Sequence, residues 1–494
     1  MRDVSLITTT AGQRLAQVDS PFIPISMGYR ILIIGYVLLY NIFMPGFQDM
    51  LYGSSVPLVQ WRFLISVIYQ FLVCLPILYY RPDYGWLHPL IFPTVYGLAK
   101  SLASRPDQLF APFLFTETSS RVIEHEALQG WSQASLAWAA LKGQLIATTA
   151  LATYYLGFFS GPQLRLPHLR FLEPRKVAPK ALAVVTCSVV IFLVFMRFRG
   201  GLTAHMTSWG EGPRFETLEG FGIVIALIQC GLVASLIWFA LDRTASRKPL
   251  FWAAVLFSIP VNFFTGGSRS AVVYAGCMFL MIWIIRNRKI PQGKIAVLGI
   301  AALVCLGLLG QLRRSTFQGE VDWAVLTGFN LQESVGASQE ELEKRTTNEG
   351  YLPVIARVPD EVDFLYGTSY VGGLLFFVPR ALWPDKPRGA GAMNGSINFG
   401  SRGGVPTGAV GEAYWNFYIP GVVVVYFLYG LFHRWLARAF AQFAWAPAFW
   451  VLYTITLFHF TPDSTSIADW CQKVVLTLAI LSWMGALSFS TKKA

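Results

Sequence analysis

The sequence predicts an all-α integral membrane protein, a polytopic bundle of about twelve transmembrane helices. Of its 494 residues, 54% are hydrophobic and only 13% are charged, whereas an average soluble domain carries roughly 25% charged residues. Apolar runs long enough to cross a bilayer recur from residue 31 to the C-terminus. We therefore expect one membrane domain over residues 1–494, with one large periplasmic loop at 313–411 inside it.

Each expected helix is an apolar run close to the roughly 20 residues that a membrane span requires. The third run is the weakest because Pro89 and Pro93 interrupt it, and the seventh and eighth are short enough to form a re-entrant pair. The expected helices cover residues 31–47, 63–80, 86–103, 135–158, 181–198, 220–241, 250–265, 270–286, 295–312, 412–432, 442–460 and 470–489.

Basic residues set the predicted orientation, because Lys and Arg collect in the cytoplasmic loops of membrane proteins. They are frequent in residues 160–180, 242–249 and 286–294 and sparse in the short loops 48–60 and 266–269. If the expected helices alternate in direction, all the basic segments fall on one side of the membrane. We therefore expect both termini to lie in the cytoplasm.

The large loop at 313–411 then lies on the outer side, where the charge rule does not apply to so long a segment. Its first part, 313–350, is polar and compatible with helix, whereas 351–411 is rich in aromatic residues, glycine and proline. A loop of this length is usually functional or disordered. We expect the second part to be compact.

The composition argues against two other classes of protein. The balance of 39 Lys and Arg against 27 Asp and Glu gives a formal charge of +12, but the sequence has no nucleic-acid-binding motif, so we expect no nucleic-acid partner. The cysteines lie in or at the ends of apolar runs without a CxxC pair, so neither disulfides nor a zinc site is expected. They are Cys74, Cys187, Cys230, Cys277, Cys305 and Cys471.

The densest group of chemically capable residues lies between residues 366 and 417. Arginine suits phosphate oxygens because its planar fork donates two parallel hydrogen bonds, and nearby glycines let backbone amides approach an anion. Aromatic rings in the same segment can stack on sugars. The alternative is that the basic residues contact lipid headgroups and the aromatic residues form an interfacial belt. These residues are Arg380, Lys386, Arg388 and Arg402, with Tyr370, Trp383 and Tyr414.

Other candidate site residues lie at the outer ends of helices. Arg269 follows Gly-Gly-Ser between two apolar runs, where a charge is costly unless it has a partner or a function; the alternative is a turn with a snorkelling side chain. Glu412, where the large loop enters the tenth helix, can act as a general base, or its carboxylate can simply favour a helix dipole. His459 and Asp463 are rival bases, and Lys142 is a possible partner for an acid or a phosphate.

Three motifs, taken in order, carry a resemblance to a known family. They are Gly-Ser-Arg269 between two helices, Val-Pro-Arg380-Ala-Leu-Trp-Pro-Asp-Lys386-Pro in the large loop, and Gly-Glu412-Ala-Tyr-Trp-Asn-Phe entering a helix. In these motifs, and in hydropathy over nearly the whole chain, the sequence resembles the bacterial O-antigen and oligosaccharide repeat-unit polymerases (Wzy-type). Arg380 and Gly391 also match the family's spacing of an Arg, ten residues and a Gly.

The resemblance implies a GT-C-like glycosyltransferase of the bacterial inner membrane. It would polymerise oligosaccharide repeat units carried on undecaprenyl pyrophosphate into O-antigen, capsular polysaccharide or exopolysaccharide. Arg269 and Arg380 would stabilise the departing pyrophosphate and Glu412 would take the acceptor's proton, with no metal and no cofactor. A flippase would supply the repeat units, and a chain-length regulator would act beside the enzyme in the bilayer.

Three other functions remain open at this point. An O-antigen ligase would favour a histidine in the large outer loop, and residues 313–411 contain none. A transporter or flippase for the same lipid-linked sugars would favour paired internal repeats, and none is evident in the sequence. The third is a non-catalytic subunit of a polysaccharide export complex.

Overall fold

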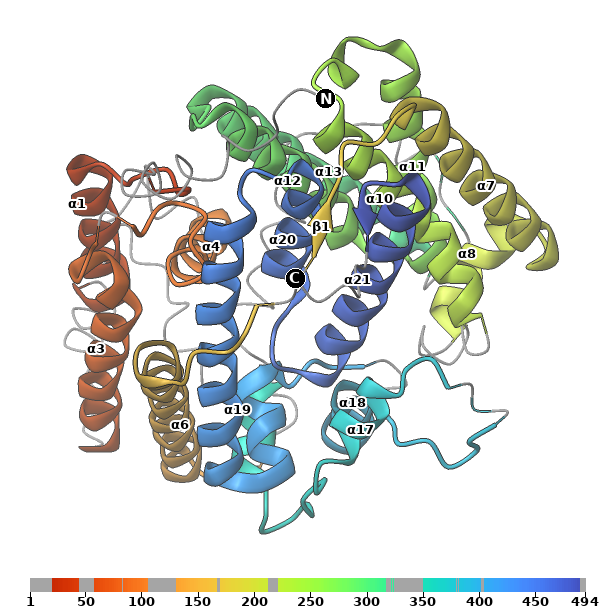
Figure 1. Cartoon of the computed structure of the whole chain (residues 1–494). Helices are drawn as coiled ribbons and strands as arrows, with labels where there is room; N and C mark the ends of the chain where they lie inside the picture. The colour runs from red at the N-terminus through yellow and green to blue at the C-terminus, as the bar shows by residue number, and fades with distance from the viewer. Residues whose placement is uncertain are drawn as a thin grey trace.

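The structure is a computed structural model that describes residues 20–43, 57–81, 83–104, 130–166, 169–211, 221–316, 321, 323, 350–378, 380, 382–400 and 404–488. Helices dominate the described chain and pack into one bundle (Figure 1). Seven of these helices are long and apolar enough to cross a membrane, and two shorter apolar helices accompany them. The chain is therefore a helical, multi-pass membrane protein.

The first half of the described chain is helical apart from a two-residue strand. Its elements are α1 (Met27–Tyr36) with the π-helix η2 (Val37–Phe43), α3 (Pro57–Leu78), α4 (Phe92–Ser104), α6 (Gln133–Ser160), β1 (Arg170–Phe171), α7 (Val177–Phe198), α8 (Leu202–Glu211) and α10 (Gly222–Leu241).

The second half adds the remaining helices and a strand that pairs with the first. Its elements are the 3-10 helix η5 (Ala245–Arg247), α11 (Pro249–Gly266), α12 (Arg269–Asn287), α13 (Gln292–Thr316), α16 (Tyr351–Arg357), α17 (Thr368–Leu374), α18 (Ala390–Phe399), α19 (Gly408–Phe443), α20 (Pro447–His459), α21 (Ser464–Met484) and β2 (Leu487–Ser488). The two strands are antiparallel, with Phe171 opposite Leu487.

Every apolar run expected from the sequence contains one of these helices, although their boundaries shift. The third helix begins at Phe92 rather than residue 86, because Pro89 lies in a series of turns that precede it. The eleventh is shorter than expected because α19 continues to Phe443 before α20 begins. How many of the runs cross the bilayer stays a prediction.

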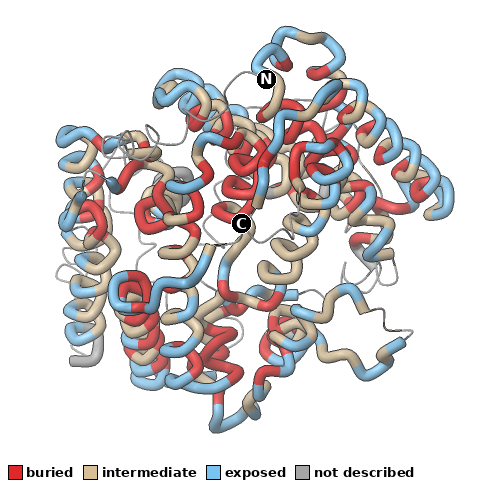
Figure 2. The backbone as a smooth tube through the Cα atoms, viewed as in Figure 1, coloured by how far each residue is buried: buried red, intermediate tan, exposed pale blue. Residues whose placement is uncertain are grey.

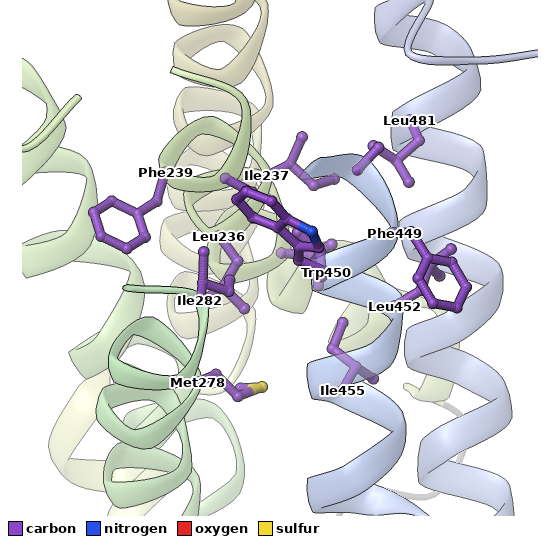
Figure 3. Packing of buried hydrophobic residues seen from close by; sticks show 14 of the residues in the cluster. Leu236, Ile237, Phe239, Met278, Ile282, Phe449, Trp450, Leu452, Ile455 and Leu481 are labelled. Atoms are coloured by element: carbon purple, nitrogen blue, oxygen red, sulfur yellow. The ribbon is translucent and has the colours of Figure 1, made fainter. Parts of the chain in front are cut away.

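The centre of the bundle is built around α10, which packs against α7, α11, α12, α20 and α21. Leu236 of α10, Ile282 of α12 and Leu481 of α21 are buried together with Trp450 of α20 (Figure 3). Exposed residues are frequent on the outer helices (Figure 2). Large apolar side chains are among the exposed residues, such as Leu256 of α11 and Val297 of α13. An apolar outer surface is what contact with lipid tails requires.

Helices α6 and α19 pack closely because glycines let their backbones approach each other. A Cβ atom at Gly157 would collide with the carbonyl oxygen of Phe427, and one at Gly430 would collide with that of Tyr154. Small residues at helix contacts are typical of membrane bundles. The two helices therefore form one unit that fixes the position of the start of α19.

Helix α19 contains a break shortly after its start. Phe417 has φ −143° and ψ 23°, and Tyr418 has φ 56° and ψ −150°. A positive φ is unfavourable for a residue with a Cβ atom. The break divides α19 into a short piece, 408–416, and a longer piece, 419–443, so the short piece can take its own direction over the end of the bundle.

The large loop is shorter than the predicted 313–411, because α13 continues to Thr316 and α19 already begins at Gly408. Most of its polar first part, predicted to be compatible with helix, lies outside the described residues. Its second part forms α16, α17 and α18, which lie at one end of the bundle beside α19 and α21 (Figure 1). Helix α16 packs against α6 and α19, and α17 packs against α21, whereas the chain between α17 and α18 extends away from the bundle (Figure 1).

Candidate functional site

Glu412 lies in the short first piece of α19, where the large loop meets the bundle. Its side chain is buried, with a residue exposure of 3%. One carboxylate oxygen, Oε1, accepts a hydrogen bond from Ser369 Oγ of α17 at 2.7 Å. The other, Oε2, accepts one from the backbone N–H of Ser464, the first residue of α21, at 3.2 Å. A single carboxylate thus joins three elements that are far apart in the sequence.

Asn416, one helical turn beyond Glu412, completes this hydrogen-bond network. Its Nδ2 donates to Ser369 Oγ at 2.9 Å and to the carbonyl oxygen of Glu412 at 2.8 Å. Its Oδ1 accepts from the backbone N–H of Gly367 at 2.8 Å. Ser369 therefore accepts from Asn416 while it donates to Glu412, which fixes the orientation of the carboxylate.

Tyr370 and Asp463 lie beside this carboxylate. Tyr370 donates its hydroxyl hydrogen to the carbonyl oxygen of Pro462 at 3.2 Å. Burial, and after it the negative charges of Glu412 and Asp463, raise the pKa of Tyr370, so its phenol stays protonated. Asp463 caps α21 by accepting from the backbone N–H of Ser466 at 2.8 Å. The structure thus brings together three of the predicted site residues.

His459 ends α20 and belongs to a second polar cluster. Its Nδ1 lies 2.8 Å from Asp469 Oδ2, and the ammonium group of Lys473 contacts the other oxygen of Asp469. The ring of Tyr274 packs edge-on against the imidazole at 5.7 Å. Sequence reasoning missed Asp469 and Lys473. Their spacing of four residues inside an apolar run was the signal that could have found them.

Arg269 begins α12 and is buried, with a residue exposure of 8%. Its guanidinium group lies against α13 at Gly310, where an added Cβ atom would stand 2.5 Å from Nη1. The turn that precedes Arg269 depends on Gly267, whose φ of 62° favours glycine and whose backbone lies against the ring of Trp209. The Gly-Gly-Ser-Arg269 turn is therefore a packed feature of the protein interior.

Helix α8 holds this turn in place through His205, which is fully buried. The imidazole Nε2 lies 3.2 Å from the carbonyl oxygen of Thr265, and Nδ1 accepts from Arg199 Nε at 3.3 Å. Burial lowers the pKa of His205, and the neighbouring Arg199 charge adds to this effect. The neutral imidazole therefore donates from Nε2 to Thr265, at the end of the helix that leads to Arg269.

The predicted phosphate-binding residues of the large loop contact their own backbone. Arg380 Nη1 donates to the carbonyl oxygens of Lys386 at 2.7 Å and Pro384 at 3.4 Å. Lys386 Nζ donates to those of Phe376 at 3.1 Å and Val378 at 3.0 Å. These contacts join Arg380 to the backbone at Pro384 and Lys386, and Lys386 to the backbone at Phe376 and Val378.

The other predicted residues of this segment differ in exposure. Arg388 is exposed and Trp383 is half-buried, whereas Arg402, also predicted to bind phosphate, lies outside the described residues. The Tyr414 ring is fully buried. Its hydroxyl group donates to the carbonyl oxygen of Val358 at 3.0 Å, just after α16 ends.

Lys142 of α6 also binds the backbone at the C-terminal end of α16. Its Nζ donates to the carbonyl oxygens of Ile355 at 3.0 Å and Val358 at 3.5 Å. In return, the hydroxyl group of Tyr351 donates to the carbonyl oxygen of Gly143 on α6 at 2.8 Å. A cation at the C-terminal end of α16 also favours its helix dipole. Lys142 therefore fastens the large loop to the bundle.

No protein-family model, no curated protein and no solved structure matches this chain. Within the described part of the chain, no three His, Cys, Asp or Glu side chains lie close enough together to hold a metal ion. The candidate site residues are therefore defined by their geometry at three places: a buried carboxylate at Glu412, the His459–Asp469 pair, and the buried Arg269 at the start of α12.

Proposed function

We propose that this chain is a glycosyltransferase of the bacterial inner membrane that polymerises oligosaccharide repeat units carried on undecaprenyl pyrophosphate. The proposal includes about twelve membrane spans in a GT-C-like arrangement, both termini in the cytoplasm, and a reaction on the periplasmic face. It rests on the three motifs and on one observation, the buried carboxylate of Glu412 at the junction of α17, α19 and α21.

Burying a carboxylate costs free energy unless hydrogen bonds replace the water that it loses. Glu412 accepts two hydrogen bonds, which reduce the cost of burying its carboxyl group. A fixed carboxylate beside a loop is also a common arrangement for a general base. The buried, hydrogen-bonded carboxylate supports the proposal that Glu412 takes the proton from a sugar hydroxyl.

In the proposed reaction, a hydroxyl oxygen of the acceptor sugar attacks the anomeric carbon of the donor. A new carbon–oxygen bond forms while the bond from that carbon to the pyrophosphate oxygen breaks. The hydroxyl proton passes to Glu412, and the electron pair leaves with the lipid pyrophosphate. The donor chain is thereby transferred to the acceptor repeat unit, which keeps its own lipid pyrophosphate, and the polymer grows by one repeat unit.

Basic residues would stabilise the negative charge that develops on the leaving group. Arg269 and Arg388 are the proposed contacts of the pyrophosphate. Arg380 and Lys386 hold the loop that presents Arg388, because both donate to carbonyl oxygens within it. His459, paired with Asp469, is the reserve proton acceptor.

The test is Glu412→Gln, assayed with the purified protein and lipid-linked repeat units. Glutamine has the same shape and can accept from the Ser464 N–H, but it cannot take a proton. We expect the ladder of lipid-linked products to form at least about a hundredfold more slowly, while thermal stability changes little.

The matched control is Glu361→Gln, which removes an exposed carboxylate from the same loop, paired with Arg357 at 3.0 Å. It should retain full activity. Unchanged polymerisation in Glu412→Gln would show that Glu412 only joins helices. Transfer of finished polymer to an acceptor, or movement of lipid-linked sugar without new linkages, would identify a ligase or a flippase instead.

A further inference from the structure

A recess of about 560 Å³ opens where α3 and α6 end and the longer piece of α19 passes them. It lies at the opposite end of α6 from the large loop: Phe159 is about 24 Å farther along the helix axis than Gly143, which Tyr351 contacts. The recess is lined by Leu75, Tyr79, Arg81, Tyr84, Phe158, Phe159 and Arg434.

Two arginines supply the positive charge of this recess. Arg434 Nη1 donates to the carbonyl oxygens of Phe159 and Gly161, where α6 ends. Arg81 Nη2 donates to the hydroxyl group of Tyr79 at 2.8 Å. In the part of the chain that the structure describes, neither guanidinium group forms an ion pair with a carboxylate. The recess therefore carries two positive charges and is suited to an anion.

The rest of the lining is apolar and aromatic. Tyr84 and Phe158 are buried, whereas Tyr79 and Phe159 are 54% and 37% exposed and stand edge to face at 6.5 Å. Exposed aromatic rings are typical of the membrane interface, where their polar and apolar parts match the headgroup zone. Charge and apolar surface thus meet within one recess, which a free inorganic anion would not require.

We propose that this recess binds an anionic phospholipid. Its phosphate lies between Arg81 and Arg434, and an acyl chain lies against Leu75 and Phe159. Arginine favours a phosphodiester because it can donate two hydrogen bonds to its oxygens, and basic pockets between helices bind anionic headgroups. The site does not depend on the proposed enzymatic function.

The test uses the full-length protein in zwitterionic nanodiscs, titrated with phosphatidylglycerol and followed by native mass spectrometry and thermal unfolding. The wild-type protein should retain phosphatidylglycerol in preference to phosphatidylcholine and unfold at a higher temperature with it. Arg81→Gln should weaken this binding about tenfold or more, because a hydrogen bond to a charged group is lost. Among the residues that the structure describes, Arg81 donates to the Tyr79 hydroxyl group and to no backbone carbonyl oxygen, so this variant keeps the described contacts of the helix ends.

The matched control is Arg438→Gln, one helical turn beyond Arg434, which donates to the carbonyl oxygen of Leu164 at 3.2 Å but does not line the recess. It should bind phosphatidylglycerol like the wild type. The proposal is wrong if Arg81→Gln also binds normally, or if Arg438→Gln loses as much affinity. It is equally wrong if inorganic phosphate alone gives the same stabilisation, since the site would then be one for a free anion.

Discussion

Three basic side chains donate hydrogen bonds to backbone carbonyl oxygens of the large loop. Arg380 and Lys386 each donate to two carbonyl oxygens, and Lys142 donates to two more. Irregular backbone carries carbonyl groups that no helix satisfies, and such groups need partners when water is excluded. The basic residues of the motif around Arg380 and Lys386 could therefore be identified from the sequence, but their hydrogen-bond partners could not. Those partners are carbonyl oxygens in turns, and turns have no simple periodicity in the sequence.

His205 makes a prediction about pH possible at the level of one residue. Its pKa is lowered in the folded protein, so the unfolded chain binds the proton more readily. Its contribution to stability is therefore complete above the unfolded pKa of about 6.5 and is lost as the pH falls below it, by at most about 1.4 kcal/mol per pH unit.

We expect His205→Gln to reduce the loss of stability between about pH 7 and pH 5. Glutamine can still donate to the Thr265 carbonyl but does not titrate. The measurement is the thermal unfolding midpoint of both proteins in detergent across this range. Equal slopes for the two proteins would show that other groups control the acid sensitivity.

Among the elements, helices were the most predictable part of the fold. An apolar run of about 20 residues has few alternatives to a helix in a membrane, since its backbone groups must pair within the segment. Breaks were harder to place: Pro420 lies near the interruption of α19, but the unusual dihedral angles fall on Phe417 and Tyr418. The buried network of Ser369, Glu412 and Asn416 depends on that break and on loop contacts, which the sequence does not display.

The contact between α6 and α19 gives a prediction at the level of elements. Gly430→Ala should lower the free energy of unfolding by roughly 1–3 kcal/mol, as is typical of an overpacked contact. The reason is that its Cβ atom would collide with the Tyr154 carbonyl oxygen. Gly35→Ala is the control, since nothing lies within 4 Å of its added Cβ atom. Thermal unfolding in detergent should separate the two variants, and equal midpoints would contradict close packing of the two backbones.

At the scale of the whole molecule, the question is which end of the bundle faces the cytoplasm. The distribution of basic residues predicts that α16, α17 and α18 lie on the outer side of the membrane and that the turn between α10 and α11 lies in the cytoplasm. Hydropathy and charge were sufficient for this prediction. The packing of the large loop against α6 and α21 could not be predicted in the same way, because it depends on three-dimensional contacts between distant segments.

Cysteine labelling can test this orientation in a variant that lacks the native cysteines. Glu361→Cys should react with a membrane-impermeant maleimide in intact spheroplasts, whereas Arg247→Cys should react only after the membrane is opened. Both positions are exposed in the structure, so accessibility is not limited by folding. The reverse pattern would place the large loop in the cytoplasm and remove the basis for a periplasmic reaction.

The attachments of the large loop bear on how a lipid-linked sugar would reach Glu412. The loop is fastened at one side through Lys142 and Tyr351 and at the other through Ser369 and Ser464. Movement of the whole loop away from the bundle would leave several buried polar groups without hydrogen-bond partners, each at a cost of about 1–3 kcal/mol. If the proposed function is right, we expect a polyprenyl chain dissolved in the bilayer to enter laterally between helices, so that the sugar reaches Glu412 while the contacts of the large loop stay intact.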